Sequence, residues 1–218
     1  YFYQKVYLAH RSFDAPTVMI TEGYDRPAHR IYELSDLLAG NQLQVEHRYF
    51  GKSMPDSLDY QYLTLEQATG DLHAINQLFR KLYVRDWVST GISKGGQTTI
   101  FYRYFYPNDV DVSVPYVAPL NTSLEDNRIY QFLDTVGTQE CRQKIFDVQK
   151  RLLQNRGEFL QKLKWFAKGA DKHFTYLSLE QAFEYAVLEY SFSFWQWGSD
   201  CSKIPGEKVD GDSLFSYF

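Results

Sequence analysis

The sequence predicts an α/β fold, with a mostly parallel sheet and helices on both of its faces. Three observations predict this class. Apolar and β-branched stretches alternate with helical patterns through the first 119 residues, as parallel strands joined by crossover helices require. Residues 86–102 read as a strand, a tight turn and a helix in direct succession. From residue 120 the pattern is helical only, which indicates a separate helical segment.

Each element of the sheet region rests on a local pattern. Besides the strand that enters the turn of 86–102, strands are expected over residues 2–8, 16–21, 43–46 and 110–117. The first crossover helix is expected over 29–39, because apolar residues recur there at helical spacing and Gly40 follows. Further helix starts are expected at Thr64, with Gln67 three residues on, and at Ser178, with Gln181. Both pairs fit a capping box.

The turn in 86–102 carries the chemistry. Residues 91–95, Gly-Ile-Ser-Lys-Gly, match the G-x-S-x-G nucleophile elbow of α/β hydrolases. This short motif also arises by chance as a glycine-rich turn with a surface serine, but the strand before it and the helix after it favour the elbow. We therefore expect Ser93 to be a nucleophile, with the Lys94 N–H helping to hold an oxyanion.

Ser93 needs a histidine base and an acid that orients it, and in α/β hydrolases both follow the serine. His173 is the only histidine after Ser93, and it lies in the helical segment, where we interpret it as an ordinary surface residue. The chain is accordingly expected to be the amino-terminal part of a catalytic unit and to be inactive alone. The expected organisation is an α/β-hydrolase core over 1–119, a helical lid over 120–199 and a loop over 200–218 that leads to the remainder.

Composition excludes several function classes. A formal net charge of -4 without a cluster of Lys and Arg argues against nucleic-acid binding. No apolar run is long enough to cross a membrane, and we find neither a signal peptide nor a metal-ligand or phosphate-loop motif, so no metal or cofactor is expected. Cys141 and Cys201 are compatible with a disulfide, with two free thiols, or with pairing to another segment.

Several blocks of sequence carry a family resemblance. Residues 21–24, 45–55, 87–97 and 110–121, in this order, and then 188–198, resemble the secreted bacterial prolyl tri- and tetrapeptidyl aminopeptidases, serine peptidase family thirty-seven. The block at 46–49, Glu-His-Arg-Tyr, is also similar to prolylcarboxypeptidase and dipeptidyl peptidase II. The resemblance covers nearly the whole chain.

The resemblance implies a secreted or periplasmic exopeptidase that acts on peptides with a free N-terminus. It would release tri- or tetrapeptides by cutting after proline, through an acyl-enzyme on Ser93. A carboxylic ester hydrolase and a truncated, non-catalytic relative that only binds peptides are the alternatives.

The resemblance also suggests roles for further residues. An N–H or hydroxyl from Gly23 and Tyr24 would complete the oxyanion hole with Lys94. Glu22 would meet the substrate ammonium group, or else form a buried salt bridge with Arg48. The remaining candidates are Glu46 and Arg48 as supporting residues, and Trp195 and Trp197 either as lining of a specificity pocket or as lid core.

Overall fold

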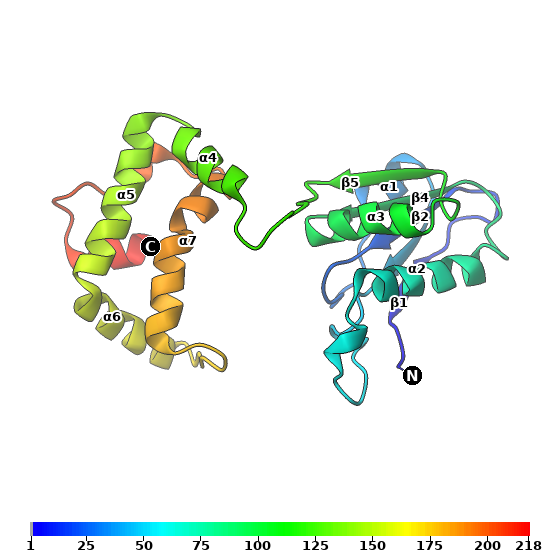
Figure 1. Cartoon of the computed structure of the whole chain (residues 1–218), viewed down its shortest axis with the longest axis horizontal. Coiled ribbons are helices and arrows are strands. Elements are labelled where there is room, and N and C mark those ends of the chain that lie inside the picture. The colour runs from blue at the N-terminus through cyan, green and yellow to red at the C-terminus, as the bar shows by residue number, and fades with distance from the viewer. Residues whose placement is uncertain (1) are drawn as a thin grey trace. The chain divides into compact units, whose positions relative to one another are not determined.

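The computed structural model describes residues 2–218. The chain divides into two compact units, Tyr1–Asn121 and Thr122–Phe218. The first contains a sheet flanked by helices, and the second contains helices only (Figure 1). Each unit has a buried apolar core of its own, so each is a packed structure in its own right.

The sheet of the first unit is mostly parallel. Among the described residues it consists of β1 (Val6–Ala9), β2 (Thr17–Thr21), β3 (Asn41–Val45), β4 (Trp87–Ile92) and β5 (Val112–Tyr116). The strand order is β1-β3-β2-β4-β5, and only the β1–β3 pair is antiparallel. The parallel strands β2, β3 and β4 are joined by crossover helices, so the carboxyl ends of β2 and β4 lie at the same edge of the sheet.

Helices cover both faces of this sheet. On one face, α2 (Leu65–Phe79) and α3 (Lys94–Phe105) bury Leu72 and Tyr102 against Met19, Leu43 and Trp87. The other face carries Val18, Ile20 and Val88, packed against Tyr32 and Leu34 beside the short helix α1 (Glu33–Leu37). A 3-10 turn, η1 (Tyr60–Tyr62), precedes α2. The predicted mixed α/β class is confirmed.

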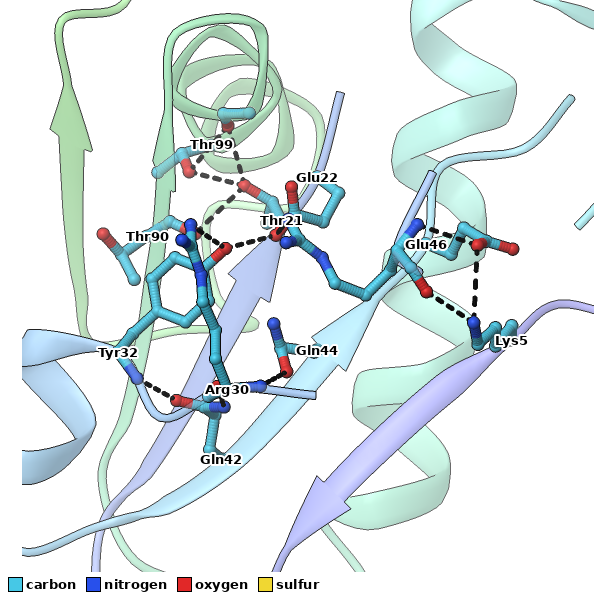
Figure 2. Close-up of polar contacts among 12 residues, drawn as sticks. Lys5, Thr21, Glu22, Arg30, Tyr32, Gln42, Gln44, Glu46, Thr90 and Thr99 are labelled. Atoms are coloured by element: carbon cyan, nitrogen blue, oxygen red, sulfur yellow. Dashed lines mark hydrogen bonds and ion pairs between the residues drawn. The ribbon is translucent and has the colours of Figure 1, made fainter. Parts of the chain in front are cut away.

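The first crossover helix is shorter than the sequence predicts. It was expected over 29–39 but covers only Glu33–Leu37. The side chain of Gln42 on β3 accepts a hydrogen bond from the Tyr32 N–H (2.8 Å) and donates one to the Arg30 carbonyl (2.7 Å), which Figure 2 shows. The bond from Gln42 uses the Arg30 carbonyl, which a helix would need for the N–H four residues later, and Tyr32 has an extended backbone.

Three predicted strands also have different bounds. The strands expected over 2–8 and 110–117 are Val6–Ala9 and Val112–Tyr116. The strand expected over 43–46 begins earlier, at Asn41, because its polar side chains are satisfied inside the protein. Asn41 accepts from the Arg11 N–H at 2.7 Å and donates to the Ser12 carbonyl at 2.7 Å. Hydropathy alone therefore misses its first two residues.

The two predicted capping boxes differ in the structure. Ser178 and Gln181 form both hydrogen bonds of the box at the start of α7 (Leu179–Gln196). Thr64 accepts from the Gln67 N–H at the start of α2, but Gln67 does not return the bond. Its side-chain oxygen lies instead 3.5 Å from the guanidinium of Arg48, so only half of the first box is present.

The second unit is helical throughout. It contains α4 (Asn127–Thr135), α5 (Gln139–Gln154), α6 (Arg156–Gly169), α7, the turn η2 (Cys201–Lys203) and α8 (Gly211–Tyr217). A disulfide joins Cys141 on α5 to Cys201, with Cα atoms 5.5 Å apart, which decides between the alternatives left open by the sequence. The prediction of a loop over 200–218 is wrong, because η2 and α8 lie in this range. Asp210 caps α8 by accepting from the Ser213 N–H, and Leu214 is fully buried in the helical core.

Candidate active site

Ser93 lies on a sharp turn between β4 and α3. Its backbone has φ 57° and ψ −121°, a conformation that non-glycine residues rarely adopt. The Ser93 N–H donates to the Tyr116 carbonyl at 3.0 Å, and the Ser93 carbonyl accepts from the Gln97 N–H at 2.9 Å. The residue is exposed. The chain therefore holds one serine hydroxyl at the carboxyl end of β4, in strained backbone and open to solvent.

The glycines two residues before and after Ser93 are required by packing. A Cβ at Gly91 would lie 2.3 Å from the Gly95 carbonyl oxygen and 2.5 Å from that of Thr21. A Cβ at Gly95 would also lie 2.5 Å from the Thr21 oxygen. The Thr21 hydroxyl in turn lies 2.6 Å from Thr99 Oγ1, and Figure 2 shows this threonine cluster at the end of β2. The contacts explain the G-x-S-x-G spacing, because β2 and α3 meet at the turn with no room for side chains.

The structure brings Gly23 directly against Lys94. Gly23 is buried, and a Cβ placed on it would lie 2.5 Å from Lys94 Cβ and 2.9 Å from the Lys94 backbone carbon. The turn after β2 thus contacts the residue that follows Ser93, where the oxyanion hole is predicted. The neighbouring Tyr24 is exposed, and its ring lies beneath the Lys94 ammonium, with Nζ 4.9 Å from the ring centroid. Burial lowers the pKa of Lys94.

Glu22 is held by partners that the sequence did not suggest. Its Oε1 forms an ion pair with Arg26 and accepts from the Tyr32 hydroxyl at 2.8 Å, as Figure 2 shows for Tyr32. Burial raises the pKa of Glu22, against the lowering effect of Arg26 and Tyr32. The alternative of a salt bridge between Glu22 and Arg48 is wrong, because Arg48 makes two hydrogen bonds of 2.7 Å to Asp71 instead.

Glu46 holds together the two loops beside the site. This buried carboxylate accepts hydrogen bonds from the N–H groups of Arg26, Lys52 and Ser53 and from the Ser53 hydroxyl, all within 2.9 Å. Burial opposes ionisation of Glu46, but these donors outweigh it and lower its pKa. Glu46 therefore positions the segment that bears Arg26, the partner of Glu22.

The residues that sequence reasoning missed are partners rather than motif members. Arg26 follows Glu22 by four residues, but the two lie in a loop and not in the helix that this spacing would indicate. Tyr32 and Asp71 belong to no spacing pattern, and the one available signal was their hydroxyl or charge near Glu22 and Arg48, which many surface residues share.

Among the described residues of the sheet unit, no histidine contacts the Ser93 hydroxyl, which makes no hydrogen bond within that unit. His47 Nδ1 lies 2.8 Å from the Arg48 carbonyl oxygen and His73 Nδ1 lies 2.7 Å from Asp109 Oδ2. His173 belongs to the helical unit and is exposed beside Asp171, at 3.3 Å. Within the sheet unit, the described residues thus place no histidine base beside the predicted nucleophile.

The two candidate tryptophans also lie in the helical unit. Trp195 packs against the helical core and over Gly137, where a Cβ would meet its ring at 2.3 Å. Trp197 follows α7 and is 78% exposed. Only Trp195 takes part in core packing, so the core interpretation fits Trp195 and does not fit Trp197.

The described residues form neither a metal-binding cluster nor a membrane-spanning helix. In that part of the chain no group of His, Cys, Asp or Glu could hold a metal ion. No helix there is long and apolar enough to cross a membrane.

Comparison with known proteins identifies relatives along the whole chain. A prolyl tri/tetrapeptidyl aminopeptidase from Streptomyces mobaraensis is 35% identical over 223 residues, a match that covers 99% of this chain and 46% of the relative. A protein named probable serine protease EDA2, from Arabidopsis thaliana, is 26% identical over 226 residues, covering 94% of this chain and 45% of that protein. The chain thus spans about half the length of these relatives.

Among solved structures, Est1E from Butyrivibrio proteoclasticus with bound ferulic acid matches 51% of this chain and 47% of its own, at 16% identity and a TM-score of 0.41. The family model described as PS-10 peptidase S37 matches residues 1–214. Together with the 35% identity over nearly all of the chain, this match shows that the chain belongs to the PS-10 peptidase S37 family.

Proposed function

We propose that the full-length protein is a serine exopeptidase that releases tri- or tetrapeptides from free N-termini, cleaving after proline. The observation that carries the proposal is the exposed Ser93 on its strained turn, with Gly23 packed against Lys94. Family membership supports peptide hydrolysis, and the printed name of the Streptomyces relative supports this specificity. The activity belongs to the whole protein, of which this chain is about half by comparison with the relatives.

The proposed reaction proceeds through an acyl-enzyme. The Ser93 oxygen attacks the carbonyl carbon of the proline residue while its proton passes to a general base. The resulting oxyanion accepts hydrogen bonds from the Lys94 N–H and from the turn at Gly23 and Tyr24. The scissile C–N bond breaks as the amine takes up the proton, and water then hydrolyses the ester.

The general base and its acid are assigned to polypeptide outside this chain. This assignment is supported by two findings: no described histidine of the sheet unit contacts Ser93, and the relatives are about twice as long. A serine hydroxyl without such a base is a weak nucleophile at neutral pH. Experiments on activity therefore require the full-length protein.

Glu22 is the proposed acceptor for the substrate ammonium group. Its Oε1 is occupied by Arg26 and Tyr32, but its Oε2 accepts no hydrogen bond from the described residues and is not fully buried. One carboxylate oxygen therefore remains for a cation, while the other fixes the group in place. The proposed role of Trp197 in a specificity pocket is supported only by its exposure.

We also propose that the protein works in an oxidising compartment, outside the cell or in the periplasm. The Cys141–Cys201 disulfide supports this location, because such bonds persist where thiols are not kept reduced.

A fluorophosphonate probe tests the nucleophile. We expect the full-length protein to label and the Ser93→Ala variant not to label. A proline-terminated tripeptide amide should be hydrolysed, with a much lower kcat/KM for the same amide with a blocked amino group. Labelling that persists in Ser93→Ala refutes the nucleophile, and a preference for simple acyl esters over the peptide amide favours an ester hydrolase.

A further inference from the structure

The side chain of Lys94 is the point where three segments of the sheet unit meet. Its stem lies against Gly23, on the turn after β2. Its Nζ lies 4.9 Å from the centroid of the Tyr24 ring and 4.7 Å from that of Phe50, which belongs to the loop after β3. The two rings contact each other edge to face, with centroids 5.6 Å apart. Lys94 thus joins the elbow, the turn after β2 and the loop after β3.

These contacts replace the usual partner of a lysine. Among the described residues of the sheet unit, Lys94 Nζ has neither a carboxylate within ion-pair distance nor a hydrogen bond. The faces of two aromatic rings attract a cation through their negative charge density, and more strongly where water is partly excluded. Lys94 is partly buried. The two rings are therefore its principal electrostatic partners in the described part of the chain.

The loop that carries Phe50 is itself fixed to the turn. The His47 N–H donates to the Tyr24 carbonyl at 3.1 Å, and the rings of His47 and Phe50 lie 5.8 Å apart, edge to face. The side-chain Oε1 of Glu46, the residue before His47, accepts a hydrogen bond from the Arg26 N–H at 2.8 Å. On its loop side the turn is held by one backbone bond, from His47 to Tyr24, and by one bond to the Glu46 carboxylate. On its elbow side Lys94 supplies the contact.

We propose that Lys94 is a positioning residue, whose ammonium between Tyr24 and Phe50 keeps the turn at Gly23 seated on the elbow. The inference rests on the proposed function of the site. One residue then serves the oxyanion hole twice, because its N–H is one donor and its side chain holds the second donor in place. A neutral side chain of similar length retains the first contribution and loses the second.

The test compares variants of the full-length protein. Lys94→Met removes the charge and keeps an unbranched stem, whereas Lys94→Arg keeps a cation that also binds aromatic faces. Phe50→Leu removes one ring, and Lys81→Met, at an exposed lysine outside the site, is the matched control. The readouts are kcat and KM on a proline-terminated tripeptide amide, the rate of fluorophosphonate labelling, and amide hydrogen exchange at residues 22–26.

We expect Lys94→Met to lower kcat and the labelling rate by about tenfold, with KM within about twofold, because a shielded cation–π contact has this order of strength. Exchange at residues 22–26 should become faster in the same variant. Lys94→Arg should recover most of the loss and Lys81→Met should behave as wild type. Adding Phe50→Leu to Lys94→Met should cost less than the product of the two single effects.

Equal activity of Lys94→Met and wild type overturns the proposal, and so does an equal loss in Lys94→Met and Lys94→Arg. Unchanged exchange at residues 22–26 in Lys94→Met also overturns it, whatever reaction the enzyme performs. If the wild-type protein fails to label at Ser93, the proposed function fails, and the exchange measurement still decides the role of Lys94. If Lys94→Met does not fold, Phe50→Leu carries the same comparison, with unchanged exchange again counting against the proposal.

Discussion

Replacing Gly23 by alanine probes the proposed oxyanion hole with the smallest possible change. The added Cβ would lie 2.5 Å from Lys94 Cβ, 2.6 Å from its Cγ and 2.9 Å from its backbone carbon. Carbon atoms pack at about 3.5–4.0 Å, so the two segments must separate by roughly 1 Å. Oxyanion donors act at about 2.7–3.1 Å from the oxyanion. A displacement of about 1 Å at a reacting centre costs on the order of 10²-fold in rate.

We therefore expect Gly23→Ala to lower kcat of the full-length enzyme by about 10²-fold on a proline-terminated tripeptide amide, with little change in KM. Gly157→Ala is the control, because no atom lies within 4 Å of a Cβ at Gly157, near the start of α6. That variant should keep wild-type kcat. A Gly23→Ala enzyme within about twofold of wild-type kcat would show that the turn after β2 takes no part in stabilising the oxyanion.

Two further predictions concern stability. The double variant Cys141→Ser, Cys201→Ser should lower the free energy of unfolding of the helical unit by about 4 kcal/mol, since the disulfide closes a loop of 60 residues. Denaturant unfolding followed by circular dichroism of the helical signal measures this loss. An unchanged unfolding midpoint would contradict the prediction. Glu46 has a lowered pKa in the folded protein, so its contribution is present above the pKa of an unfolded glutamate and disappears as pH falls toward the folded pKa. Thermal unfolding should therefore show a weaker acid dependence below about pH 5 in Glu46→Gln than in wild type, and parallel pH profiles would argue against it.

The elbow could be predicted from sequence because its geometry depends on neighbours along the chain. Ser93, Gly91 and Gly95 lie within five residues, and the strand and helix on either side carry ordinary hydrophobic patterns. The approach of Gly23 to Lys94 could be expected in outline, since the carboxyl ends of parallel strands share one edge of a sheet. Neither inference required knowledge of a long-range side-chain contact.

The polar partners of Glu22 and Arg48 could not be predicted, because they depend on contacts between loops and not on neighbours along the chain. Glu22 pairs with Arg26 and Tyr32 and not with Arg48, and each of these pairings depends on how a loop folds over the sheet edge. The same holds for β3, where Gln42 is fully buried because it satisfies residues 30–32, so a polar side chain occupies a core position. Hydropathy cannot distinguish such a residue from an exposed one.

The strained turn at Ser93 indicates where the function of this unit is determined. A residue held in such a conformation costs on the order of 1–3 kcal/mol and persists only where its surroundings fix it. Its backbone bonds go to Tyr116 and Gln97, and the flanking glycines pack on Thr21, all within Tyr1–Asn121. The position of the proposed nucleophile is therefore set by the sheet unit itself, and variants that weaken the helical unit should leave the labelling rate of Ser93 unchanged.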